Sequence, residues 1–108
     1  MKQRPSAAAK RDKQAALDAL AQVLAALKRS DDVRAFLQDL CTPAELEVMA
    51  DRWGVVPLLQ QRVSYREIHG LTGVSVTTIG RVARTMENGA GGYAIAIGRQ
   101  TRRGASSH

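Results

Sequence analysis

The side chains with the clearest chemical potential gather between residues 62 and 84 of the chain. This stretch carries four arginines against a single acid, Glu67, which gives it a net charge of +3. Serine and threonine hydroxyls lie between the arginines in the run SVTTIGR. Guanidinium groups bind phosphate oxygens, and arginine and threonine side chains can hydrogen-bond to base edges. The pattern therefore indicates contact with a nucleic acid rather than the making and breaking of bonds.

Little in the sequence could support catalysis or metal binding. The histidines are His69 and His108, and the single cysteine, Cys41, cannot form an internal disulfide. No serine–histidine–aspartate set, glycine-rich phosphate loop or paired carboxylates can be recognised. No apolar run reaches membrane-spanning length, and no signal-peptide core is present. We therefore expect a cytoplasmic protein that is not an enzyme, without membrane partner, metal site or certain cofactor, in which Cys41 is a small buried apolar residue.

A short helix is predicted from Tyr65 to Thr72. Ser64 is its expected N-cap and Glu67 stands at its third position, which together form the capping-box pattern. Gly73 follows the last helical residue and can take the positive φ with which many helices end. This helix is therefore brief and has a defined start and a defined stop.

A second helix is predicted over residues 76–87, with Ser75 as its N-cap. The turn between the two helices is short and contains glycine, which is the geometry of a helix-turn-helix. His69 departs from the usual pattern, because a small residue normally stands at its position to allow close helix contact. The apolar residues expected to pin one helix across the other are Ile68, Val74, Ile79 and Val82.

The second helix is expected to read the major groove of double-stranded DNA. Thr77 can hydrogen-bond to base edges, Val76 can touch a thymine methyl, and Arg81 can reach guanine or phosphate. Ser64 and Arg66 of the first helix are placed for backbone phosphates. With Gly80 counted on the exposed face of the second helix, the candidate DNA-binding residues are Ser64, Arg66, His69, Ser75, Val76, Thr77, Thr78, Gly80, Arg81 and Arg84.

Helical patterns also fill the first half of the chain, so the expected fold class is all-α, a helical bundle. A helix is expected to begin near Lys13. Its apolar seam could pack on the protein's own core or on a second chain. The seam has the three- and four-residue spacing of a and d positions and consists of Leu17, Leu20, Leu24 and Leu27.

Two further helices are predicted before the helix-turn-helix. Ser30 is expected to cap the first of them. Thr42 and Glu45 form a capping box at the start of the second, whose buried face would include Trp53. Pro57 lies within this second pattern and should kink or end the helix.

Charge and composition divide the chain into three parts. Residues 1–12 are expected to be a flexible basic arm, residues 13–93 a helical DNA-binding and dimerisation domain, and residues 94–108 a basic tail that is mostly flexible. The formal net charge is +6, and the two ends carry its excess. Residues 30–52 hold six acids and two arginines, so one face of the body is expected to be acidic and another basic.

These stretches resemble the Trp-repressor superfamily. CTPAELEVMADRWGVV and SYREIHGLTGVSVTTIGRVARTM are similar to its sequences, and NGAGGY resembles the ending of its YerC/YecD-type branch. The resemblance covers roughly residues 30–93. It implies a homodimer in which two chains intertwine through their N-terminal and middle helices and present two recognition helices to an operator.

The resemblance also implies a candidate effector pocket. In tryptophan-binding members two arginines sandwich the indole, and Arg52 and Arg81 match both; the alternative is that they form ion pairs and contact phosphate. Val82 falls where those members have glycine and Asp39 where they have leucine, so tryptophan is disfavoured and any small-molecule corepressor is left open. The candidate effector-binding residues are Thr42, Arg52, Val56, Arg81 and Thr85, and Thr78 also falls on a pocket position.

Two functions fit these patterns. The first is a sequence-specific DNA-binding transcriptional regulator, a repressor of an operon that family analogy places in amino-acid metabolism. The alternative is a protein-interaction module that uses the helix-turn-helix as a scaffold and contacts another factor through the acidic residues between 31 and 51. Salt-dependent binding to the DNA upstream of its own gene would separate the two functions.

Overall fold

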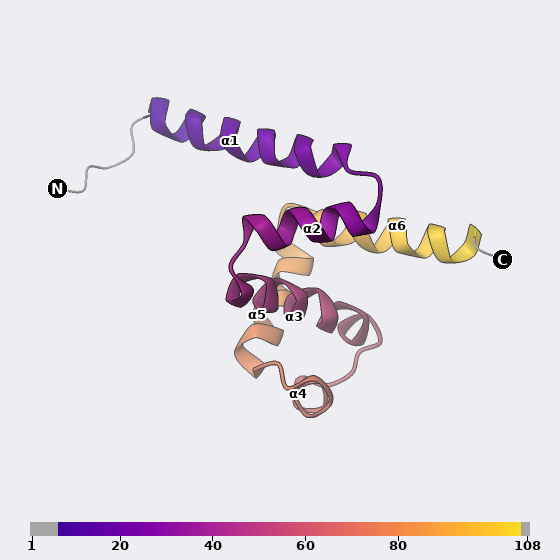
Figure 1. Ribbon diagram of the computed structural model, residues 1–108. Coiled ribbons are helices and arrows are strands. Elements are labelled where there is room, and N and C mark those ends of the chain that lie inside the picture. The colour runs from indigo at the N-terminus through magenta and orange to yellow at the C-terminus, as the bar shows by residue number, and fades with distance from the viewer. Residues whose placement is uncertain (1–6, 107–108) are drawn as a thin grey trace. The chain divides into compact units, whose positions relative to one another are not determined.

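The structure, a computed structural model, describes residues 7–106, and these contain six helices and no strand (Figure 1). The all-α prediction is confirmed. The chain divides into two compact units after Leu46. The helices are α1 (Ala7–Ala26), α2 (Ser30–Leu40), α3 (Pro43–Gln60), α4 (Tyr65–Thr72), α5 (Val76–Asn88) and α6 (Gly92–Ser106).

The unit before Glu47 contains α1, α2 and the first turn of α3. None of the side chains described in α1 and α2 is buried. Leu17 is 65% exposed, and the other three leucines of the seam are half-buried. Cys41, which was expected to be buried, is also half-buried. The leucine seam is therefore accessible at Leu17 and only partly covered at its other three leucines.

The predicted capping box at the start of α3 is confirmed. The Thr42 N–H donates to Glu45 Oε1 at 2.8 Å, and the Glu45 N–H donates to Thr42 Oγ1 at 3.1 Å. These bonds, the one from the Thr42 backbone first, hold the pKa of the Glu45 carboxyl below its usual value. Two N–H groups that the helix leaves without partners are thus satisfied.

The predicted cap at Ser30 is wrong. α2 begins with Ser30 itself, and the N-cap position is taken by Arg29, whose side chain makes no capping hydrogen bond. The first turn instead contains Asp31 and Asp32, whose negative charges favour the positive end of the helix dipole. Charge in the first turn, rather than a capping hydroxyl, marks this helix start.

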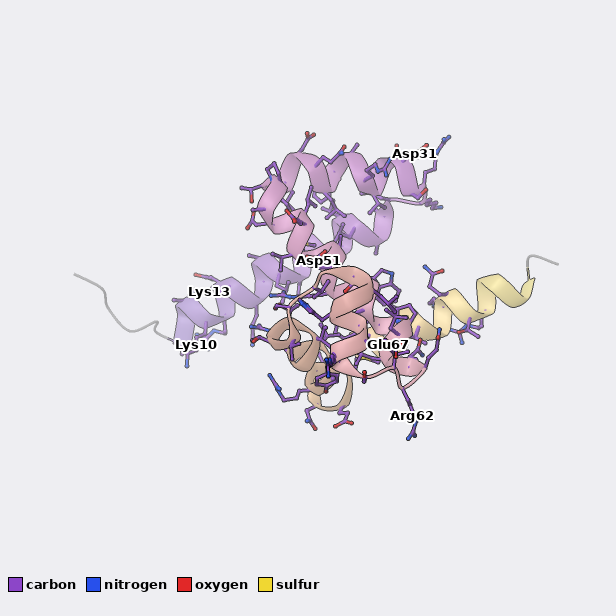
Figure 2. The ribbon with its side chains drawn as sticks, turned by 90° about the horizontal axis from the view of Figure 1, so that it is seen from below. Lys10, Lys13, Asp31, Asp51, Arg62 and Glu67 are labelled. Carbon is purple, nitrogen blue, oxygen red and sulfur yellow. The ribbon has the colours of Figure 1, made fainter. Side chains whose placement is uncertain are left out.

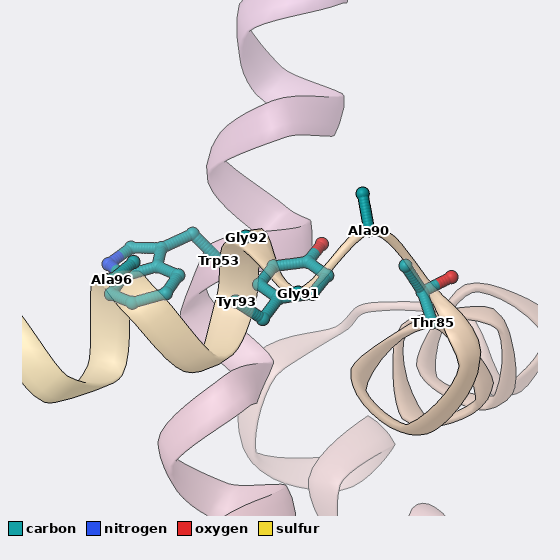
Figure 3. A pocket seen from close by; sticks show the side chains of 7 residues that line it. All are labelled: Trp53, Thr85, Ala90, Gly91, Gly92, Tyr93 and Ala96. Atoms are coloured by element: carbon teal, nitrogen blue, oxygen red, sulfur yellow. The ribbon is translucent and has the colours of Figure 1, made fainter.

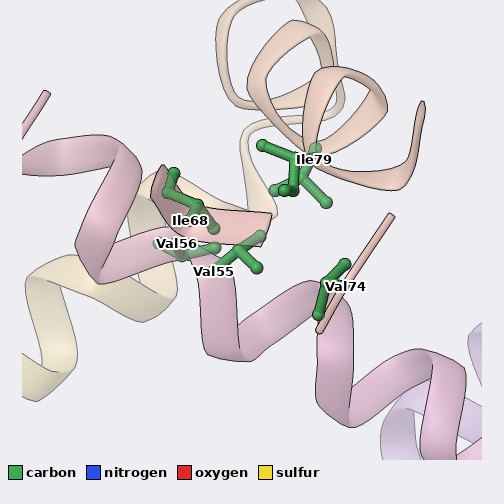
Figure 4. Close-up of a cluster of buried hydrophobic side chains, with 6 residues drawn as sticks. Val55, Val56, Ile68, Val74 and Ile79 are labelled. Atoms are coloured by element: carbon green, nitrogen blue, oxygen red, sulfur yellow. The ribbon is translucent and has the colours of Figure 1, made fainter. Parts of the chain in front are cut away.

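The unit after Leu46 is built around a small buried core (Figure 4). The close-up shows α3, α4 and α5 converging on this cluster. Each buried side chain of this kind stabilises a fold by about 1.5–3 kcal/mol, so the cluster holds the three helices together. The six side chains, none more than 7% exposed, are Val55, Val56, Ile68, Val74, Ile79 and Val82.

Pro57 was expected to kink or end α3, and the helix does not end there but continues to Gln60. Proline has no N–H, so the helix loses one hydrogen bond at Pro57. Continuing the helix places Leu58 and Leu59 against the core, and the burial of these two side chains stabilises the longer helix. Trp53, expected to be buried, is 37% exposed. An apolar stripe in the sequence indicates which face of a helix can be buried, but it does not show whether another element packs against that face.

The helices extend further toward both ends than predicted. α1 begins at Ala7 where a flexible arm was expected, and alanine has the highest intrinsic helix propensity. α6 runs to Ser106 where a mostly flexible tail was expected, and Tyr93 and Ile97 pack its first half against the core. The remaining parts of the predicted arm and tail, residues 1–6 and 107–108, lie outside the described residues.

Candidate nucleic-acid interface

α4 and α5 form the predicted helix-turn-helix within a residue of the predicted bounds. The Glu67 N–H donates to Ser64 Oγ at 3.2 Å, so Ser64 caps α4. Gly73 has φ 76°, the left-handed backbone that favours glycine, and closes α4. The Thr78 N–H donates to Ser75 Oγ at 3.1 Å, so Ser75 caps α5. These three local signals confirm the predicted turn.

The end of α5 also matches the predicted stop. Gly89 follows Asn88, and its N–H donates to the Thr85 carbonyl at 2.8 Å. A Cβ at Gly89 would lie 2.6 Å from that same carbonyl oxygen. A residue with a side chain would therefore force the backbone apart at the point where α5 ends.

α5 has one face in the core and an opposite face in solvent. Ile79 is fully buried and Val82 is 1% exposed. Side chains on the opposite face are free of the core, and they combine an apolar group, a hydroxyl and two guanidiniums. These exposed side chains belong to Val76, Thr77, Arg81 and Arg84.

Gly80 does not belong to the exposed face, so its predicted exposure is wrong. It is buried, and a Cβ at this position would lie 3.6 Å from Cε2 of the Tyr65 ring and 3.3 Å from Nη1 of Arg84. The Tyr65 ring and the Arg84 side chain therefore cover this position of α5 in the single chain.

Exposed arginines lie on both helices of the helix-turn-helix and in the turn before α4. Among residues 7–106 the ion pairing is confined to Arg29 and Asp31, so these arginines have no carboxylate partner there. Arg62 has φ 62° in the turn after α3, and Figure 2 shows its side chain extending away from the ribbon. Unpaired guanidinium groups suit phosphate oxygens. The four exposed arginines are Arg62, Arg66, Arg81 and Arg84.

The predicted serine and histidine contacts have structural partners inside the turn. Ser64 and Ser75 use their hydroxyls as helix caps, and Ser75 Oγ also donates to Thr78 Oγ1 at 3.0 Å. Thr78 is half-buried. His69 is exposed, and its Nδ1 lies 2.8 Å from the Val74 carbonyl oxygen. These side chains thus shape the turn, whatever else they contact.

Two of the candidate effector-binding residues lie together in the structure. Arg81 and Thr85 line a surface hollow of about 210 Å³ on α5 that Arg84 also borders. Thr85 Oγ1 donates to the Arg81 carbonyl at 2.9 Å. The hollow is shallow, and the side chains of two arginines border it.

The other three effector candidates do not line this hollow. Val56 is 1% exposed and belongs to the core. Thr42 belongs to the unit before Glu47 and accepts the Glu45 N–H. Arg52 is half-buried, and its Nε is buried without a hydrogen-bond partner among the described residues. Within the unit after Leu46, Arg52 and Val56 therefore do not join Arg81 and Thr85 at this hollow.

A second hollow, which the sequence analysis did not predict, lies between α3, the end of α5 and the start of α6 (Figure 3). Its volume is about 430 Å³. The rings of Trp53 and Tyr93 stack at its wall, with centroids 6.4 Å apart and planes 8° from parallel. The GGY run gave the signal for it, because Gly91, with φ 87°, turns the chain so that Tyr93 returns to α3.

Comparisons with known proteins agree with this arrangement. A model of the family described as Trp repressor protein matches residues 15–101 of the chain. The chain belongs to the Trp repressor family. It is 35% identical over 83 residues to YerC of Bacillus subtilis (strain 168), a match that covers 77% of this chain and 80% of YerC.

A solved member of the Trp repressor family shows the same fold. The crystal structure of a Staphylococcus aureus protein, provisionally named as a Trp repressor, superimposes with a TM-score of 0.74 at 31% identity. The match covers 81% of this chain and 87% of that chain. The Trp repressor family is one of helix-turn-helix DNA-binding regulators, and α4 and α5 have the arrangement of such a motif.

Among residues 7–106, no helix is long and apolar enough to cross a membrane. No group of three or more histidine, cysteine, aspartate or glutamate side chains in this part of the chain could hold a metal ion.

Proposed function

We propose that this protein is a sequence-specific repressor that reads the major groove of double-stranded DNA with α5. The observation that carries the proposal is the exposed face of α5, where Thr77 and Arg81 project away from the core beside Val76. Thr77 donates to base edges, Val76 contacts a thymine methyl, and Arg81 reaches guanine or phosphate. By analogy with the family, the controlled operon belongs to amino-acid metabolism.

Phosphate contacts orient this helix on the duplex. Arg66 lies in the first turn of α4, exposed and without an ion-pair partner among the described residues. Its guanidinium binds the phosphate backbone beside the groove that α5 enters, and Arg84 does the same from the far end of α5. Such contacts set register and affinity without reading sequence.

The repressor acts as a homodimer. The leucine seam of α1, only partly covered in the single chain, supports this, because a second copy of α1 would cover the same apolar spacing. Two recognition helices related by a twofold axis would meet half-sites about 34 Å apart, one turn of the duplex. The operator should then be a palindrome or nearly so.

Selection of bound sequences from a random pool of duplexes tests the proposal. We expect one symmetric motif to be enriched. Affinity for it should fall with salt, with a slope of log K against log salt of about −0.9 per phosphate neutralised. DNA from upstream of the protein's own gene is the first natural candidate. Failure to enrich any motif, with no salt-dependent binding, would favour the protein-interaction module instead.

Free tryptophan is expected not to act as a strong corepressor. Val82 stands where the tryptophan-binding members have glycine, and here it is 1% exposed with its methyl groups in the core. An indole at that place would need the volume that Val82 fills, and interiors have no spare volume of that size. Titration calorimetry should show no saturable heat with tryptophan. Tight, stoichiometric binding would contradict this expectation.

A further inference from the structure

The main chain of Val74, in the turn between α4 and α5, is held on both sides by side chains of α4. The Val74 N–H donates to Thr72 Oγ1 at 3.1 Å. The Val74 carbonyl accepts a hydrogen bond from His69 Nδ1 at 2.8 Å. Thr72 Oγ1 in turn donates to the Ile68 carbonyl at 2.7 Å, which anchors the threonine to its own helix. We call this arrangement the Val74 clamp.

The clamp provides hydrogen-bond partners for the Val74 N–H and carbonyl, which have no other partner among the described residues. The Val74 side chain is 7% exposed and belongs to the core, so its main chain lies beside apolar groups. A turn has no helical or sheet partner for such groups, and a buried N–H or C=O left unpaired is costly. Two α4 side chains supply the missing partners, and the turn keeps one conformation.

The clamp also determines where α5 points. The Val74 carbonyl belongs to the peptide that leads into Ser75, the N-cap of α5. Because a peptide is planar, holding this carbonyl oxygen holds the plane from which α5 departs. The His69 bond therefore controls the angle between α4 and the helix proposed to enter the groove.

The His69 ring can do this because it does not lie between the helices. His69 is exposed and lies at the edge of the turn, so the small residue usual at this position is not required. A carbonyl oxygen only accepts hydrogen bonds, so Nδ1 carries the proton and Nε2 of the neutral ring does not. The structure thus implies one particular tautomer.

We propose that His69 is a positioning residue, which fixes the recognition helix α5 by donating from Nδ1 to the Val74 carbonyl. The DNA-affinity part of its test rests on the proposed repressor function, whereas the spectroscopic part does not. The proposal differs from a direct contact between His69 and DNA, which would use the outward-facing Nε2.

Long-range proton–nitrogen spectra of the full chain without DNA test the bond directly. In the neutral ring we expect His69 to be in the tautomer that carries the proton on Nδ1, as the carbonyl requires. His108, the other histidine of the chain, provides an internal reference in the same spectra. A His69 ring with its proton on Nε2, or an even mixture of tautomers, would overturn the proposal.

Three substitutions separate positioning from direct contact. His69→Ala removes the donor and should weaken binding to the selected DNA motif about three- to tenfold, the effect of one net hydrogen bond. His69→Asn keeps an amide N–H near the place of Nδ1 and should restore most of that affinity. His69→Gln places its N–H near Nε2 and should not. Leu71→Ala, at a residue of α4 that is 67% exposed, is the matched surface control and should bind as the parent does.

Restoration by glutamine but not by asparagine would overturn the proposal in favour of direct contact. Equal affinity of the alanine variant and the parent would also overturn it. If circular dichroism shows that His69→Ala does not fold, the comparison of His69→Asn with His69→Gln and the tautomer of His69 still test the proposal. If the parent itself binds no DNA, the proposed function fails, and the tautomer alone decides whether the Val74 clamp exists.

Discussion

Replacing Leu20 and Leu24 of α1 with glutamate is expected to leave a protein that no longer binds DNA and is either unfolded or monomeric. Burial of one leucine stabilises a fold by about 1.5–3 kcal/mol, so two contribute about 3–6 kcal/mol. That is a large fraction of the stability of a small domain, about 5–15 kcal/mol. Two carboxylates placed in an apolar interface would add a further penalty for lost hydration.

The expected loss follows from where the apolar surface lies. The described core belongs to the unit after Leu46, and no side chain described in α1 or α2 is buried. Most helical stability in proteins comes from packing of an apolar face, and the leucine seam of α1 is only partly covered in the single chain. A second copy of α1 would provide that packing, so we expect the unit before Glu47 to depend on the proposed dimer.

Ala15 and Gln22 offer a matched control on the same helix. Both are exposed, and both lie off the leucine seam. Replacing them with glutamate adds the same two charges without touching the apolar spacing, so dimer and DNA binding should be kept. Light scattering coupled to gel filtration gives the mass, and circular dichroism gives the helix content. A well-folded monomer of the unmutated protein at micromolar concentration would contradict the prediction.

The second large effect is expected at the exposed face of the helix-turn-helix. Substitutions of Thr77, Arg66 and Arg81 by alanine should each change DNA binding in a different way. Thr77→Ala removes a hydroxyl from the first turn of α5 and should change the preferred site at one base pair. Loss of a base-reading group costs about 1–3 kcal/mol at the position that it reads. Selection from a random pool reports this change directly.

Arg66→Ala should weaken binding to all sequences alike. The Arg66 guanidinium is exposed on α4, beside the helix proposed to enter the groove, and is proposed to contact phosphate. Losing one phosphate contact lowers the steepness of the salt dependence by about one unit and leaves the preferred sequence unchanged. Selection at two salt concentrations separates this outcome from the one expected for Thr77→Ala.

Arg81→Ala should combine both effects. Its side chain is exposed on α5, and it also borders the hollow shared with Thr85. Arg34→Ala is a suitable control, because Arg34 is an exposed arginine among the acidic residues of α2. If Thr77, Arg66 and Arg81 variants all bind the parent's site with the parent's affinity, the helix-turn-helix is a scaffold and the interaction-module function is correct.

The sequence by itself determined the local structure of the DNA-binding motif. Ser64 and Ser75 each cap a helix through an N–H three residues away, and Gly73 ends α4 because a positive φ costs glycine nothing. These effects act over one helical turn and need no distant partner. The residue types alone were therefore enough to place both helices and to indicate the family.

Tertiary structure decided the points at which packing competes with a local preference. Pro57 disfavours a helix locally, yet α3 continues because Leu58 and Leu59 gain burial beyond it. Gly80 falls on the face that periodicity assigns to solvent, yet the Tyr65 ring covers it. Whether a residue is buried depends on which other elements pack against it, and the periodicity of the sequence does not identify those elements.

The role of His69 shows the same limit at the level of single bonds. In the sequence, His69 only differs from the small residue that is usual at this position of a helix-turn-helix. In the fold, the left-handed Gly73 folds the chain back so that the Val74 carbonyl comes to 2.8 Å from His69 Nδ1. A hydrogen bond needs both partners at a fixed distance and direction, and only the folded backbone provides them.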